Sequence, residues 1–172
     1  LRPQIQALLR HGVESSVSQS FLACMSDIMF FGIGEEPKSI KEFKEYLASS
    51  ITLEIFAGLQ NGNLINTFAD TQITTQTQLE EVDISEYVKS PLRQSNNEIL
   101  DADFIKMVLA FKRFKSYLQS DKSLIDYTYL WDLICSPGIH KSHLDGINLV
   151  ILEIPDADST TNVNILCPSN HY

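Results

Sequence analysis

The chain has few of the residue patterns that mark metal sites, disulfide frameworks or membrane segments. Its three cysteines (Cys24, Cys135 and Cys167) include no CxxC pair, and its four histidines show no HExxH spacing. We therefore expect free thiols in a reducing compartment, with no zinc site and no cofactor. No apolar run reaches the roughly 20 residues of a membrane helix, and no signal segment follows Leu1. We expect a soluble, intracellular protein with no membrane contact.

Positive charge is also scarce, with 13 basic against 22 acidic residues and a net charge of −9. An acidic surface repels phosphate backbones, so the charge disfavours nucleic-acid binding. The one basic run, 106–115, carries apolar residues at helical spacing and is best explained as the solvated face of a helix. Scattered carboxylates usually serve solubility, but they would also suit a basic protein partner.

The length of 172 residues fits a single domain over 1–172. Because the chain begins at Leu1 and not at Met, we expect it to be a piece of a longer polypeptide. Within the domain, segment 71–80 is rich in Thr and Gln. Such residues bury too little apolar surface to offset the cost of ordering, which predicts a mobile loop.

Most of the remaining chain has the periodicity of helices. Predicted helices cover 18–31, 39–47, 53–59, 64–68, 104–118 and 123–134. Ser39 and Glu42 form a capping box at the start of the predicted helix 39–47. Asn61-Gly62 is expected to end the predicted helix 53–59. The clearest stripe lies in 104–118, with Asp101 and Asp103 placed ahead of that helix.

The last thirty residues change to a β-type composition. Segment 147–154 is apolar and β-branched, and a second short strand is predicted over 163–166. Helices first and strands last argue for an α+β fold, with N-terminal helices packed on a small C-terminal β-sheet.

Two short segments resemble the cysteine proteases of the ovarian-tumour (OTU) type. Those enzymes carry Asp-Gly-Asn-Cys-Leu-Phe-Arg-Ala near their start and end in two strands followed by a histidine and an aromatic residue. Here Phe21 and Ala23 match the first motif, and His171-Tyr172 follows the two predicted strands. The resemblance implies a papain-like fold, with His171 as the catalytic base and Asn170 and Tyr172 as partner-binding neighbours.

The same alignment places Gln19 at the position of the family's cysteine nucleophile. An amide cannot serve as that nucleophile, and a base without one performs no covalent catalysis. The resemblance therefore implies a pseudoenzyme. The rival prediction is an active deubiquitinase or related thiol hydrolase, with His171 as base and Cys24 or Cys167 as a relocated nucleophile.

The whole chain is also similar to a domain of large proteins from nucleocytoplasmic large DNA viruses (giant viruses). Segments 20–24, 126–131, 148–153 and 167–172 carry this likeness. It implies a viral protein that acts in the host cytoplasm or the virion. We expect a binding or assembly module whose partner is a ubiquitin-like protein or a viral subunit, while a transcription or capsid scaffold is a third possibility.

Each candidate residue also has a purely structural explanation. Free cysteines are often buried, which applies to Cys24 beside apolar neighbours and to Cys167 at a strand end. His140 and His143 could ligate a metal, but they have no further ligands at a suitable spacing. Trp131 could belong to a recognition surface or pack into the core.

Overall fold

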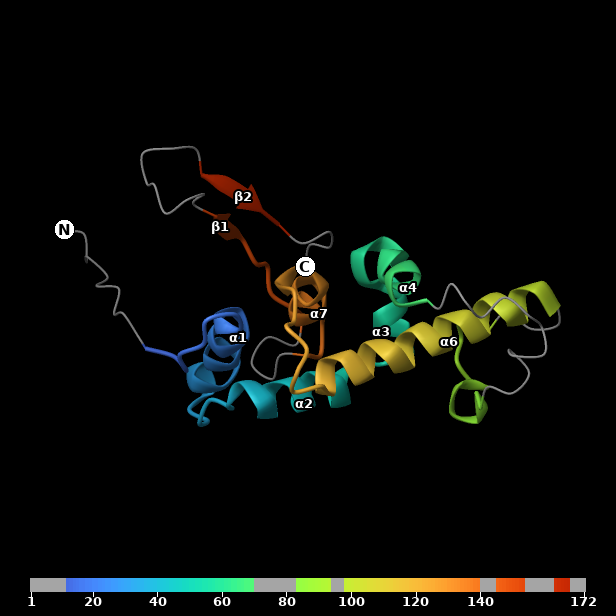
Figure 1. Ribbon diagram of the computed structural model, residues 1–172, viewed down its shortest axis with the longest axis horizontal. Helices are drawn as coiled ribbons and strands as arrows, with labels where there is room; N and C mark the ends of the chain where they lie inside the picture. Colours follow the sequence, from blue (N-terminus) through green and yellow to red (C-terminus); the bar gives the residue numbers. More distant parts are fainter. Residues whose placement is uncertain (1–11, 70–82, 94–97, 140–144, 154–162, 168–172) are drawn as a thin grey trace.

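The computed structural model describes residues 12–69, 83–93, 98–139, 145–153 and 163–167 (Figure 1). The predicted loop 71–80, the pair His140 and His143, and the segment Asn170-His171-Tyr172 lie outside these residues. The α-helices are α1 (Ser20–Phe30), α2 (Ile40–Ser50), α3 (Leu53–Gly58), α4 (Asn63–Phe68), α6 (Glu98–Gln119) and α7 (Trp131–Cys135). Short 3₁₀ turns are η1 (Phe31–Ile33), η2 (Leu59–Gly62), η3 (Ser85–Tyr87) and η4 (Tyr127–Tyr129), and the strands are β1 (Ile151–Glu153) and β2 (Asn164–Leu166).

The core forms around α6, which contacts α2, α3 and α4, while α1 packs on α2. Phe114 of α6 is fully buried. Its ring lies 5.3 Å from that of Phe56 in α3 and 5.0 Å from that of Phe68 in α4. Aromatic side chains bury the largest apolar areas, so this cluster joins α6 to α3 and α4, which lie about 30 or more residues earlier in the chain.

The sequence-based prediction of α2 and its capping box is confirmed. The Ser39 hydroxyl accepts a hydrogen bond from the Glu42 N–H at 3.3 Å, and the Glu42 carboxylate accepts from the Ser39 N–H at 2.9 Å. These two bonds satisfy backbone donors that a helix start leaves without partners. They also fix where α2 begins, which positions one wall of the site described below.

The long helix is confirmed but begins earlier than expected. The 22 residues of α6 start at Glu98, so Asp101 and Asp103 lie within the helix and not ahead of it. Lys106 lies 4.0 Å from Asp103 in an i,i+3 ion pair, a spacing that suits a helix. The apolar pattern used to predict the helix does not include such polar pairs.

The predicted helix over 123–134 is wrong in its first half. Only Trp131–Cys135 is α-helical, preceded by the 3₁₀ turn η4. The Lys44 ammonium donates to the carbonyls of Ser120 and Ser123, at 2.7 and 3.2 Å. The Asp126 carboxylate accepts from the Thr128 N–H at 2.9 Å, which starts the turn there. These bonds give the backbone of this segment partners outside a helix.

The two strands form an antiparallel hairpin in which Leu152 pairs with Ile165. This agrees with an α+β class at a coarse level. The expected packing of helices on the sheet stays a prediction: Leu152 and Ile165, on one face of the hairpin, are 64% and 67% exposed, whereas Ile151 and Leu166, on the other face, are half-buried. Figure 1 shows the hairpin projecting beyond α7, and the core consists of helices and their connections. Among the described residues, no helix combines the length and apolar character needed to cross a membrane.

A left-handed turn follows α3. Gln60 and Asn61 have φ angles of 49° and 55°, and Gly62 follows at 85°. Non-glycine residues adopt this region at a cost of about 1 kcal/mol or more each, so something must hold them there. The buried Asp132 carboxylate accepts from the Gln60 N–H at 2.8 Å, and the Gln60 side chain donates to the Thr128 carbonyl at 2.6 Å.

Candidate functional site

Gln19, the residue aligned with the family's nucleophile, is the N-cap of α1. Its side chain is only 9% exposed, and its Nε2 group donates to the Ser18 carbonyl at 3.1 Å. The Oε1 atom is buried and has no hydrogen-bond partner. Buried polar atoms are nearly always paired, so an unpaired amide oxygen at a helix start requires an explanation.

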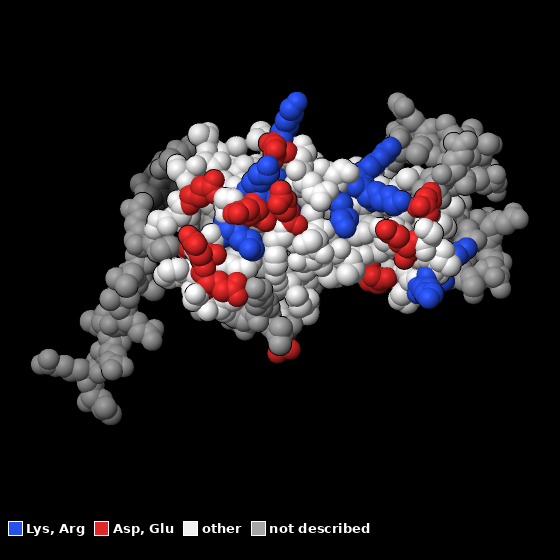
Figure 2. All heavy atoms as spheres, turned by 90° about the horizontal axis from the view of Figure 1, so that it is seen from below, with Lys and Arg blue, Asp and Glu red and all other residues white. Residues whose placement is uncertain are grey.

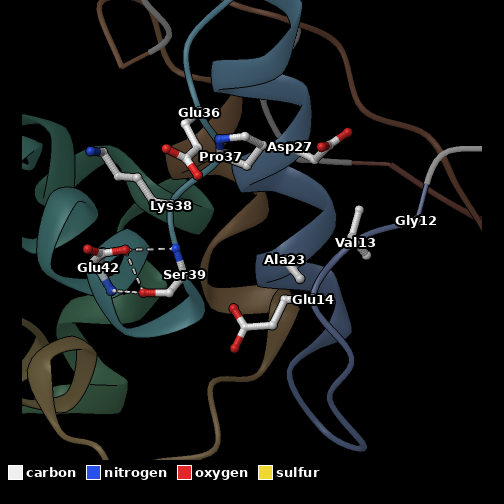
Figure 3. A pocket seen from close by; sticks show the side chains of 10 residues that line it. All are labelled: Gly12, Val13, Glu14, Ala23, Asp27, Glu36, Pro37, Lys38, Ser39 and Glu42. Atoms are coloured by element: carbon white, nitrogen blue, oxygen red, sulfur yellow. Dashed lines mark hydrogen bonds between the residues drawn. The ribbon is translucent and has the colours of Figure 1, made fainter.

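One stripe of α1, formed by Gln19, Ala23 and Asp27, borders two hollows in the surface. The larger hollow has a volume of about 640 Å³ and the smaller one about 370 Å³. The larger is lined by Gly12, Val13, Glu14, Ala23, Asp27, Glu36, Pro37, Lys38, Ser39 and Glu42 (Figure 3). The smaller is lined by Glu14, Ser15, Ser16, Ser18, Gln19, Ile40, Lys41, Lys44, Asp121, Ser123 and Leu124. We call the two hollows together the α1–α2 groove.

Glu14 lines both hollows. Its carboxylate accepts a hydrogen bond from the Ile40 N–H at 2.7 Å, and Figure 3 shows it directed toward the start of α2. A second bond joins α1 to the segment before α2: the buried Ser26 hydroxyl in α1 donates to the carbonyl of Lys38, which precedes α2, at 2.8 Å. The walls of the groove are thus fixed by hydrogen bonds to the backbone.

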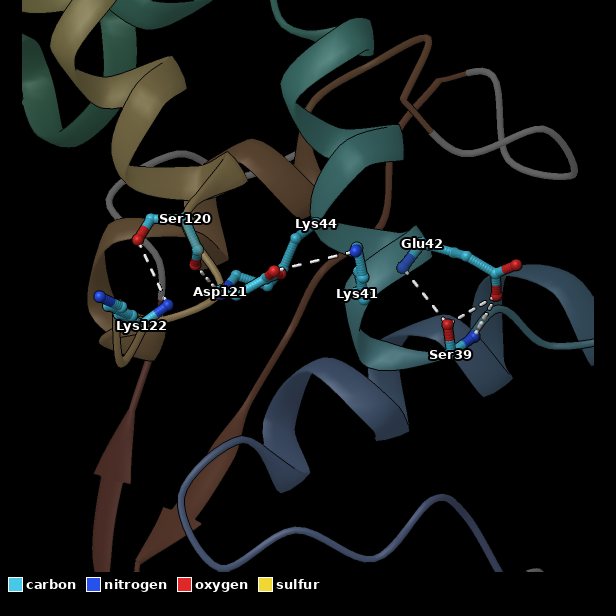
Figure 4. A network of polar contacts seen from close by, with 7 residues as sticks. All are labelled: Ser39, Lys41, Glu42, Lys44, Ser120, Asp121 and Lys122. Atoms are coloured by element: carbon cyan, nitrogen blue, oxygen red, sulfur yellow. Dashed lines mark hydrogen bonds and ion pairs between the residues drawn. The ribbon is translucent and has the colours of Figure 1, made fainter.

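The charged residues that line the smaller hollow are Glu14, Lys41, Lys44 and Asp121, and Figure 4 shows the last three of them. Lys44 is 6% exposed, and its ammonium caps the carbonyls that follow α6, where the helix dipole is negative. Burial lowers the pKa of Lys44, and the charge of Asp121 partly opposes this shift. Lys41 lies 3.8 Å from Asp121 in an exposed ion pair, which contributes little to stability.

The cysteines occupy three different environments. Cys24 lies inside α1, half-buried against the core, and Cys167 is exposed directly after β2. An interior helical position offers no free backbone N–H groups, the feature that activates a thiol at a helix start. The distance from either thiol to the ring of His171 falls outside the described residues, as do Asn170 and Tyr172, so these site assignments stay predictions.

Cys135 is fully buried, and desolvation raises the pKa of its thiol to about 11 from an ordinary value of 9.0. The folded chain therefore holds this proton more tightly than the unfolded chain. Its contribution is fully present below pH 9 and is lost as the pH rises toward 11. We expect the free energy of unfolding to fall by about 2 to 3 kcal/mol across that window on this account.

Urea denaturation at pH 8 and pH 11 measures this effect, with Cys135→Ala as the comparison. Tyr87 and Tyr117 also have pKa values raised by burial, so both proteins lose some stability at alkaline pH. The difference between the two proteins in the stability lost from pH 8 to pH 11 gives the contribution of the Cys135 thiol. Equal losses in the two proteins would mean that folding does not raise the pKa of the Cys135 thiol.

The carboxylates of the groove do not form a metal site. Within the described ranges, no group of three or more His, Cys, Asp or Glu side chains is arranged to hold a metal ion. The face seen in Figure 2 carries interspersed acidic and basic side chains with no broad area of one sign. The arrangement therefore offers hydrogen bonding and dispersed negative charge.

No model of a known protein family, no curated protein and no solved structure matches this chain. The assignment of the candidate site therefore rests on the geometry of this molecule alone. Sequence reasoning identified Gln19 but missed Glu36 and the hollow it lines. The signal available was the capping box at Ser39 and Glu42, which fixes the α2 wall but does not indicate what packs against it.

Proposed function

We propose that this chain is a catalytically degenerate OTU-like domain of papain-like fold that acts as a binding or assembly module of a larger viral protein. The observation that carries the proposal is Gln19, a buried N-cap residue at the start of α1. In the enzymes that the sequence resembles, a cysteine opens the corresponding helix. A helix start favours a thiolate, but a carboxamide there can only form hydrogen bonds.

The position of Cys24 supports the same proposal. It lies in the interior of α1 and packs against the core. A relocated nucleophile would need both an activating environment and access to a substrate. Host cytoplasm or the virion is the proposed location, and a ubiquitin-like protein or a viral subunit is the proposed partner.

A ubiquitin probe with a cysteine-trapping C-terminal warhead tests the catalytic half of the proposal. We expect no covalent adduct with the natural chain by intact mass, and measurable binding of plain ubiquitin by calorimetry. Replacement of Gln19 by cysteine, in a Cys24→Ala/Cys167→Ala background, should produce an adduct because the new thiol lies at a helix start. Ser49→Cys in the same background is the control and should react much more slowly, because this exposed position lies in the last turn of α2, away from any helix start.

Each other outcome has a defined meaning. An adduct with the natural chain that disappears in Cys24→Ala or Cys167→Ala would establish an active thiol hydrolase and contradict the proposal. Equal reactivity of Gln19→Cys and Ser49→Cys would contradict the assignment of Gln19 to the nucleophile position. Absence of both adduct and ubiquitin affinity would favour a viral scaffold, with transcription or capsid subunits as the partners to test.

A further inference from the structure

We propose that the edge of β2 that faces away from β1 accepts an extended segment of a protein partner as a third strand. The segment would be apolar at alternate positions and would carry lysine or arginine at its ends. The inference rests on the proposed function only in treating the chain as a protein-binding module. It does not depend on the OTU resemblance.

The first observation is an apolar face of the hairpin that is open to solvent. Leu152 and Ile165 lie opposite each other across the two strands, so their side chains point to the same side. Val150 and Val163 stand two residues away, and the alternation of strand side chains places them on that side as well. We call these four residues the hairpin face; in chain order they are 58%, 64%, 45% and 67% exposed. Apolar side chains gathered on one exposed face mark an interaction surface, whereas single scattered ones do not.

The second observation is the open edge of β2. Among the described residues the sheet contains two strands, so each strand has one edge without a strand partner. The main neighbour of β2 is β1, and Figure 1 shows the hairpin projecting beyond α7. Lys and Pro are two of the residues with which natural proteins guard such an edge, and β2 (Asn-Ile-Leu) carries neither. Because a two-stranded hairpin alone is marginally stable, a third strand would stabilise it.

The size of the hairpin face favours a single strand over a second copy of the chain. A fully exposed aliphatic side chain presents about 60 to 120 Å² of apolar surface, so four at these exposures offer about 200 Å² in total. A stable dimer interface buries about 800 Å² on each partner, which is far more than this face supplies. An extended segment gains the rest of its affinity from main-chain hydrogen bonds along the edge.

The charge of the hairpin sequence indicates a basic partner. Segment 145–167 contains no lysine, arginine or histidine and has four acidic residues: Asp145, Glu153, Asp156 and Asp158. Two copies joined at this edge would bring like charges together, whereas a partner strand with basic ends would meet opposite charge. The net charge of −9 acts in the same direction.

A defined peptide tests the proposal. The probe is a fluorescein-labelled, amidated peptide with a central run of alternating Val and Thr and two lysines at each end. Its binding to the full chain is followed by fluorescence anisotropy. We expect a Kd below about 1 mM. Binding should weaken when the lysines are replaced by glutamates, and also when the salt concentration is raised.

A modified probe separates strand pairing from simple apolar contact. The same peptide with every backbone nitrogen of its central run methylated keeps its side chains and its charge but has no N–H donors to pair with the edge. We expect its affinity to be about tenfold lower or less. Because this control changes the probe alone, the fold of the protein is the same in both measurements.

Two protein variants locate the binding. Leu152→Lys places a cation on the hairpin face and should weaken binding of the basic peptide about tenfold or more. Leu124→Lys is the matched control, because Leu124 is 68% exposed and lies between α6 and η4, outside the hairpin. Its affinity should be unchanged. Both substitutions are at exposed positions, so the midpoint of urea denaturation should stay close to that of the natural chain in both.

Three results of the peptide experiments would each overturn the proposal. These are no binding at about 1 mM peptide, equal affinity of the methylated peptide, and equal losses in Leu152→Lys and Leu124→Lys. Sedimentation of the chain alone adds a fourth: a dimer that Leu152→Lys dissociates would make a second copy the occupant of this edge.

Ubiquitin binding is measured separately, so that failure of this proposal and failure of the proposed function are distinguishable. Peptide binding without ubiquitin affinity would support the edge of β2 as a docking site while refuting a ubiquitin partner. Ubiquitin affinity without peptide binding would refute the docking site alone.

Discussion

Replacement of Phe114 by alanine should lower the free energy of unfolding by about 3 to 5 kcal/mol, the range found when a buried aromatic side chain is removed. Phe114 has no exposed surface and lies against Phe56 and Phe68. Truncation would leave a cavity where α3, α4 and α6 meet, and the surrounding helices can collapse into it only partly. Urea denaturation followed by circular dichroism measures the change.

Phe31→Ala is the matched control for this prediction, because the Phe31 side chain is 56% exposed. Its loss should be about 1 kcal/mol or less, in line with surface substitutions. Similar losses in the two variants would mean that the aromatic cluster around Phe114 is not the centre of the core.

The second large effect is expected for Asp132→Ala, at about 3 kcal/mol. The Asp132 carboxylate is 1% exposed and accepts the hydrogen bond from the Gln60 N–H. Without it, that donor is left in the interior and the left-handed turn at Gln60 and Asn61 loses its main support. Chemical denaturation gives the loss, and hydrogen exchange at the Gln60 amide should accelerate in parallel.

Asp132→Asn provides the internal comparison, because its side-chain oxygen can still accept the hydrogen bond from the Gln60 N–H. We expect it to lose less than half of the stability that Asp132→Ala loses. Asp126→Ala is the control. Asp126 also accepts a hydrogen bond from a backbone N–H in a turn, that of Thr128, but its side chain is exposed. We expect about 1 kcal/mol for that cap. An equal loss at both aspartates would contradict a special role for the buried one.

The parts of the fold that could be predicted depend on neighbours in sequence. The capping box of Ser39 and Glu42 involves residues three positions apart, and both of its hydrogen bonds are present. The apolar stripe of α6 is likewise local, with Phe104, Val108 and Phe111 all buried. Where a signal lies within one or two helical turns, sequence reasoning located the element correctly.

The errors arise where distant residues decide the backbone. Segment 123–134 has helical periodicity, but the Lys44 ammonium, 79 positions before Ser123, takes the carbonyl of that residue. The left-handed turn after α3 depends on Asp132, which lies 72 positions beyond Gln60. No window of neighbouring residues contains this information.

The candidate site shows the same division. Gln19 could be placed at the start of a helix from its neighbours alone, and it is the N-cap of α1. The opposite wall could not be anticipated, because the bond between Glu14 and the Ile40 N–H joins residues 26 positions apart. The burial of Gln19 and its unpaired oxygen are properties of the folded chain, and neither composition nor spacing can reveal them.

The central position of α6 has a consequence for synthesis on the ribosome. Phe43, Phe56 and Leu64 belong to helices made early, yet they are buried in a core that includes residues of α6. Until residues 98–119 have emerged, a nascent chain has no complete partner for those apolar side chains. The lysine at position 44 must wait still longer, until Ser120 and Ser123 are translated, before its ammonium meets its carbonyls. Folding of the N-terminal half is thus expected to be late and sudden, with a prolonged dependence on chaperones during elongation.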